Sequence, residues 1–114
     1  MGGLVSYEQI LRLEAQGLWH EACVELRGLL MAGQLPTIAE HLHGLGRLHQ
    51  RLGAADPARR AYLQALRLDA NRPATYNNLA LLELAQLRAE QAEAWLLRGL
   101  SLPELTDDQA DLLH

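Results

Sequence analysis

Apolar residues recur along this chain at the spacing of amphipathic helices. In the middle of the sequence they fall at positions 42, 45, 48 and 52, and again at 58, 61, 62, 65, 66 and 68, so each set lines one face of a helix. No strand is predicted. The periodicity predicts an all-α protein with helices near 5–16, 19–32, 37–52, 57–69, 73–86 and 89–102, and a short seventh helix from about residue 107.

The helical pattern also repeats along the chain. A shift of 34 residues places Leu42 on Tyr76 and Ala58 on Ala92, and a shift of 36 residues places Ala22 on Ala58. Large residues thus fall on large ones and small residues on small ones, which is the signature of stacked structural units. We predict a single domain over residues 1–114, with units of approximately 3–36, 39–72 and 73–106, and with residues 107–114 as a terminal helix or the start of a fourth unit.

Turn residues agree with a helix pair in each unit. Gly53 is expected to end one helix in the left-handed conformation, and Asp56 and Pro57 to open the next as N-cap and first-turn proline. Gly17 stands at the matching turn of the first unit. Leu87 fills that place in the third unit, where we expect a less demanding turn.

Composition and charge favour one fold class and argue against two kinds of binding partner. The chain has 27 Leu and 17 Ala but no Phe, which favours helices over sheets. Ten Arg, no Lys and 14 acidic residues give a net charge of −4, so we predict neither nucleic-acid nor membrane binding. The sequence shows no leader or membrane span, and its Leu, Ala and Arg bias resembles that of proteins from GC-rich bacterial genomes. A cytoplasmic bacterial protein is expected.

A histidine and a cysteine on one helix are the first candidates for chemistry. The segment starting at His20 begins like a zinc metalloprotease helix, but Val24 stands where the second ligand would be. His20 and Cys23 share a helix face, although no oxyanion donor or orienting acid is evident beside them. We therefore interpret Cys23 as a buried, small hydrophobic residue rather than a nucleophile.

Three further histidines do not form a metal site. His41 and His43 point about 200° apart around a helix, and His41 and His49 lie about 12 Å apart along its axis. None of these pairs can bind one ion directly. No catalytic residue, metal or cofactor is therefore predicted.

Residues 39–72 resemble the tetratricopeptide repeat, a family of helix-turn-helix units of 34 residues. Leu42 replaces the family's usual Trp, His49 its usual Tyr, and in the next unit Glu83 stands at that same aromatic position. The resemblance implies a right-handed superhelical solenoid of three helix pairs. The signature positions filled as in the family are Leu45, Gly46, Gly53, Ala58, Tyr62, Ala65 and Leu68.

The resemblance also implies a concave groove, lined by the first helix of each unit, that binds an extended peptide or a partner helix. The second helices would face the convex side, where Arg59, Arg60 and Arg67 are assigned to solubility. The groove positions are Glu40, His43, Arg47, Gln50 and Arg51 in the second unit, and Ala74, Asn77, Asn78, Leu81 and Leu84 in the third.

Two questions about this groove stay open. Arg47 and Arg51 share a helix face, where they either bind carboxylates of a ligand or form ion pairs within the chain. Leu81 and Leu84 form an apolar strip beside them. Either a partner with acidic and apolar side chains covers this strip, or the terminal helix around residues 112–113 does.

The predicted function is that of a noncatalytic interaction module, a scaffold or adaptor that binds a protein or peptide. One alternative is that the chain is the repeat segment of a larger bacterial enzyme, such as a transferase. The other is a self-assembling repeat protein that forms homo-oligomers through its C-terminal helix.

Overall fold

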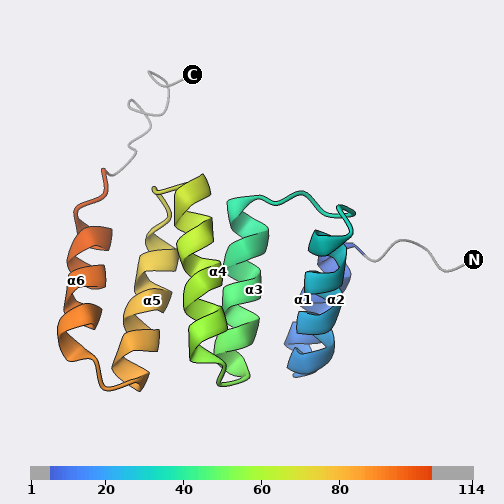
Figure 1. Cartoon of the computed structure of the whole chain (residues 1–114), viewed down its shortest axis with the longest axis horizontal. Coiled ribbons are helices and arrows are strands. Elements are labelled where there is room, and N and C mark those ends of the chain that lie inside the picture. The colour runs from blue at the N-terminus through green and yellow to red at the C-terminus, as the bar shows by residue number, and fades with distance from the viewer. Residues whose placement is uncertain (1–5, 104–114) are drawn as a thin grey trace, which may run out of the picture.

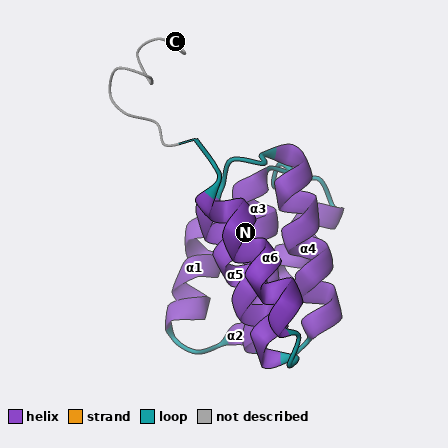
Figure 2. Cartoon of the chain, turned by 90° about the vertical axis from the view of Figure 1, so that its left-hand side faces the viewer, coloured by secondary structure: helices purple, strands orange, loops and turns teal. Residues whose placement is uncertain are grey.

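The computed structural model describes residues 6–103, which form six helices and no strand (Figure 1). The helices stand side by side and are joined by short turns within each pair, and their connections gather at the two ends of the molecule (Figure 2). In chain order they are α1 (Tyr7–Ala15), α2 (Trp19–Met31), α3 (Ala39–Arg51), α4 (Ala55–Leu68), α5 (Pro73–Ala85) and α6 (Ala89–Leu100).

The six helices predicted over this range are confirmed, and every end falls within two residues of its predicted position. The seventh predicted helix lies outside the described residues. The start of α4 corrects the prediction, because its N-cap is Ala54 rather than Asp56. The amide of Ala54 also closes the preceding turn on the carbonyl of His49 at 2.9 Å. Since α4 begins at Ala55, Asp56 falls in the first turn of α4, where its Oδ1 accepts from Arg59 Nη1 at 2.8 Å.

The three turns within the helix pairs have the same backbone conformation. Gly17, Gly53 and Leu87 have φ angles of 77°, 75° and 59°. After each of them the next amide bonds to a carbonyl five residues back, as from Arg88 to Glu83 at 2.8 Å. This closure requires a left-handed residue whatever its side chain. The expectation of a less demanding turn at Leu87 is therefore wrong, and Leu87 takes the conformation that glycine takes in the other two pairs.

Small residues allow the helices of each pair to approach closely. Ala58 and Ala92 have no more than 1% of their surface exposed. A Cβ atom at Gly46 would lie 2.6 Å from the ring of Tyr62, which is itself fully buried. These small positions therefore serve packing, and Tyr62 packs from α4 against the backbone of α3.

The first helices of the pairs lie next to one another, so that they share one face of the molecule. Glu14 of α1 bonds to Arg47 of α3, and His43 of α3 bonds to Thr75 of α5. We call the side chains that α1, α3 and α5 present here the first-helix face. Because the repeat positions of these helices match, this face presents equivalent turns of successive pairs.

Candidate functional site

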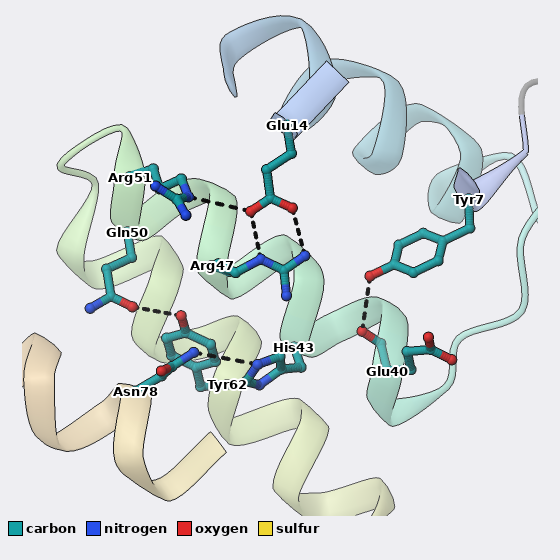
Figure 3. A network of polar contacts seen from close by, with 9 residues as sticks. All are labelled: Tyr7, Glu14, Glu40, His43, Arg47, Gln50, Arg51, Tyr62 and Asn78. Atoms are coloured by element: carbon teal, nitrogen blue, oxygen red, sulfur yellow. Dashed lines mark hydrogen bonds and ion pairs between the residues drawn. The ribbon is translucent and has the colours of Figure 1, made fainter. Parts of the chain in front are cut away.

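A cluster of three charged residues joins α1 to α3 on the first-helix face (Figure 3). The Nε and Nη2 atoms of Arg47 donate to the two carboxylate oxygens of Glu14 at 2.5 and 2.6 Å, and Arg51 Nε donates to the same carboxylate at 3.3 Å. Burial of Glu14 opposes its ionisation, but the hydrogen bond and charge of Arg47, helped by Arg51, lower its pKa. Two guanidinium groups share one carboxylate, so the cluster keeps one positive charge.

Of the two arginines, Arg51 is the more accessible. Its side chain is 48% exposed, against 30% for Arg47, and its guanidinium lies 5.3 Å from the ring centroid of Trp19. The sequence left open whether these arginines bind a ligand or form ion pairs within the chain. The structure shows the ion pair within the chain, and Arg47 makes the closer contact with Glu14. Charge reversal at Arg47 would place a carboxylate against Glu14, whereas Arg51 still has donors free to meet a ligand.

Beside this cluster, α1, α3 and the start of α2 enclose an open cleft of about 450 Å³. Its apolar walls come from residues that sequence reasoning did not assign to the groove, because the first unit is recognisable mainly from Gly17 onward. The three-residue spacing of Leu11 and Glu14 places both side chains on one face of the first helix, and this pattern could have assigned them to the groove. The lining residues are Leu11, Glu14, Ala15, Gly17, Trp19, Arg47 and Arg51.

His43, a predicted groove residue, is buried and connects α3 to α5 through hydrogen bonds. Asn78 Nδ2 donates to His43 Nε2 at 3.3 Å, which leaves His43 Nδ1 as the donor to Thr75 Oγ1 at 2.8 Å. Burial, together with the positive charges of Arg47 and Arg72, lowers the pKa of His43 to about 4. The imidazole is therefore neutral at physiological pH, and it ties α3 to α5.

The other predicted groove positions divide into bonded and exposed ones. Gln50 accepts a 2.6 Å hydrogen bond from the hydroxyl of Tyr62, so it too is engaged within the chain. Asn77, Leu81 and Leu84 are exposed, the two leucines by 51% and 48%. They follow one another at the spacing of successive turns along one side of α5. Glu40, Arg51 and Ala74 are exposed predicted groove positions too, but Leu81 and Leu84 are the large apolar side chains of the predicted groove that the described residues leave uncovered.

At the junction of α4 and α5, a buried carboxylate stands where the family has an aromatic residue. The side chain of Glu83 is 4% exposed, and its Oε1 accepts from Arg59 Nε at 2.9 Å and Nη2 at 2.5 Å. The assignment of Arg59 to solubility is therefore wrong. Arg59 supplies the counter-charge that the burial of Glu83 requires.

Cys23 is buried, as predicted, with 4% of its surface exposed. Its Sγ lies 3.7 Å from Nδ1 of His49 on α3, whereas His20 is exposed. Burial raises the pKa of the thiol and lowers that of His49, so neither group is charged at neutral pH. Among residues 6–103 no three His, Cys, Asp or Glu side chains gather as a metal site would require. Within the same range, no helix combines the length and the apolar character needed to cross a bilayer.

Comparison with known proteins gives a fold but no family. No protein-family model matches the sequence, and no curated protein is significantly similar. Among solved structures, the Yersinia enterocolitica type III secretion chaperone SycD, in complex with a peptide of the translocator YopD, is 20% identical with a TM-score of 0.78. That match covers 94% of this chain and 80% of the other.

A second similar structure is PcrH in complex with the chaperone-binding region of PopB. It is 23% identical with a TM-score of 0.78, over 93% of this chain and 84% of that one. Another structure of SycD covers 99% of this chain at 18% identity, with a TM-score of 0.73. The chain has a TPR-like helical-repeat fold. The predicted all-α repeat architecture is thereby confirmed.

Proposed function

We propose that this chain is a noncatalytic member of the tetratricopeptide repeat family that binds a segment of a partner protein on its first-helix face. The observation that carries the proposal is the exposed strip of Asn77, Leu81 and Leu84 on α5. In the 34-residue register, Leu81 matches Arg47 of α3, so the strip and the charged cluster lie on the same face. The solved complexes of SycD and PcrH with translocator segments support binding by this fold.

The face suits a segment that carries both apolar and acidic side chains. Leu81 and Leu84 offer apolar surface whose burial drives association, and Asn77 offers an amide to a partner backbone. Arg51 offers guanidinium donors to a carboxylate, with Trp19 and Leu11 as apolar walls beside it. The units 3–36, 39–72 and 73–106 would present these groups on successive turns of the stack.

The test begins with proteins captured from a lysate of the source organism, each then purified and titrated against the chain. Leu81→Asp with Leu84→Asp should weaken binding by at least about tenfold, because burial of a Leu side chain contributes roughly 1.5–3 kcal/mol. The matched control is Val24→Asp with Leu68→Asp on α2 and α4, since these side chains are 53% and 54% exposed. Circular dichroism verifies the fold of both double variants.

The control should bind as the parent does. Equal affinity of the parent and the Leu81 and Leu84 variant would contradict the proposal, provided that both are folded. Arg51→Gln leaves the bond between Arg47 and Glu14 in place and should weaken binding a few-fold, with a smaller salt dependence. Removal of the acidic residues from the partner segment should abolish that difference.

Self-association is the alternative, because the same apolar strip could pack against a second copy of the chain. A structure of SycD has been solved as an alternative dimer. Sedimentation of the parent and the Leu81 and Leu84 variant separates it from the proposal. If the parent is a dimer and the variant is a monomer, a second copy of the chain occupies this face.

A further inference from the structure

On the opposite side of α3 from Arg47, a second cleft runs between α2 and α4. It encloses about 270 Å³, and residues of α2, α3 and α4 line it. The residues from α4 recur at the spacing of one helix face, so they line the cleft along about two turns. His49 lies two residues from Arg47, which places the two side chains about 200° apart around α3. The lining consists of Arg27 from α2, Leu45 and His49 from α3, and Pro57, Arg60, Ala61 and Gln64 from α4.

The charge of this cleft is unbalanced. Its lining contains two arginines and a histidine but no carboxylate. Within residues 6–103, Arg27 and Arg60 take part in none of the ion pairs, as is also true of Arg12, Arg67, Arg72 and Arg98, whereas Arg47, Arg51, Arg59 and Arg88 have acidic partners. Arg27 and Arg60 are the two of these that line one cleft. Like charges around a half-enclosed space repel one another, and a bound anion would relieve that repulsion.

The repeat does not by itself produce this arrangement. The 36- and 34-residue shifts place Arg27 on Leu63 and Arg60 on Ala94, and they place His49 on Glu83. The junction of α4 with α5 therefore has an acid where the junction of α2 with α3 has an imidazole. The three basic residues of the cleft are therefore not repeated at the second junction, so the repeat pattern does not account for them.

We propose that this cleft binds a phosphomonoester group carried by a peptide. Guanidinium groups bind phosphate oxygens in pairs, and the amide of Gln64 is a further donor at the rim. Leu45 and Ala61 make a shallow apolar floor, and the lining has no aromatic ring besides His49 on which a nucleobase would stack. A phosphorylated serine or threonine side chain fits this chemistry better than a nucleotide does.

His49 reports on occupancy. Its pKa is lowered by burial and by the charges of Arg27 and Arg60, and Cys23 contacts its ring from α2. A bound phosphate dianion would offset the two arginines and raise that pKa. The shift requires an anion beside the imidazole, so it distinguishes binding in the cleft from binding elsewhere on the chain.

The probes are inorganic phosphate, adenosine monophosphate, and a short acetylated peptide with and without a phosphoserine, each titrated into the full chain by NMR. His49→Gln assigns the imidazole signals. The phosphopeptide should bind more tightly than inorganic phosphate or the nucleotide and should raise the pKa of His49. Arg27→Gln with Arg60→Gln should weaken its binding by at least about tenfold, since each arginine contributes charge-assisted hydrogen bonds.

Arg12→Gln with Arg67→Gln removes the same charge from α1 and α4 outside the cleft, and it should change the affinity less than about twofold. Circular dichroism verifies the fold of each variant. Equal weakening in both double variants would show general electrostatic attraction and overturn the proposal. So would an unchanged pKa of His49 at saturation, or tighter binding of the nucleotide than of the phosphopeptide.

Discussion

Arg59 and Glu83 connect α4 to α5 at the place where Cys23 and His49 connect α2 to α3. The 36-residue shift places Cys23 on Arg59, and the 34-residue shift places His49 on Glu83. Cys23 and His49 make a 3.7 Å contact between neutral groups. Arg59 and Glu83 make charged hydrogen bonds of 2.9 and 2.5 Å. Equivalent positions in the two junctions thus hold a neutral pair in one case and a pair of opposite charges in the other.

The charged pair predicts a non-additive mutation series. Arg59→Leu should lower the free energy of unfolding by about 3 kcal/mol, because it leaves the carboxylate of Glu83 buried without its main partner. The double variant Arg59→Leu with Glu83→Leu should recover most of that loss, since no buried charge remains. Urea unfolding of the parent, both single variants and the double variant measures the coupling, and additive losses would contradict the role of the pair.

His43 predicts a loss of stability in mild acid. Its folded pKa of about 4 lies below its ordinary value of 6.5, so the unfolded chain binds this proton first as the pH falls. The stability that depends on neutral His43 is complete above about pH 6.5 and is lost as the pH falls towards 4, by up to about 3 kcal/mol. Urea unfolding at pH 7, 5.5 and 4 measures this loss.

In the same series, His43→Gln should be less stable than the parent at pH 7 by about 1–2 kcal/mol. The difference should narrow or reverse by pH 4. His20→Gln is the control, because His20 is exposed and its variant should follow the parent at every pH. Parallel curves for the parent and His43→Gln would show that His43 does not titrate in this range.

The left-handed backbone at Leu87 predicts a stabilising substitution. Leu87→Gly should raise the free energy of unfolding by about 1 kcal/mol, because glycine adopts φ near 59° without a Cβ clash and the Leu side chain is 93% exposed. A rise of about 4 °C or more in the melting temperature corresponds to this gain. Gly53→Leu should have the opposite sign, and a loss of stability in Leu87→Gly would show that its side chain contributes to packing.

Gly44 and Tyr7 predict a rescue. A Cβ atom at Gly44 would overlap the hydroxyl of Tyr7, which donates a long 3.5 Å hydrogen bond to the carbonyl of Glu40 (Figure 3). Gly44→Ala should therefore destabilise the protein by about 1–2 kcal/mol. In a Tyr7→Phe background the same change should be neutral or stabilising, because alanine favours a helix by about 1 kcal/mol over glycine. Thermal unfolding of the four proteins measures the cycle, and an equal cost in both backgrounds would contradict the contact.

The sequence by itself determined the helices and the positions of the turns between them, although not the N-cap of α4 or the conformation of Leu87. These depend on interactions within a few residues, such as the apolar spacing that defines α3 and the conformational freedom of Gly53. The repeat also predicts that Arg47, Arg51, Leu81 and Leu84 share one face, because stacked units present matching positions in the same direction.

Only the tertiary structure decided which side chains meet between the units. Glu14 and Arg47 are 33 residues apart, and Arg59 and Glu83 are 24 apart, so their contact depends on how far each helix slides and turns against the next. The family resemblance assigned Arg59 to the convex side and to solubility, because it described one helix without its neighbour. Burial and counter-charge are properties of packed helices, and for that reason they became visible only when α4 and α5 were placed together.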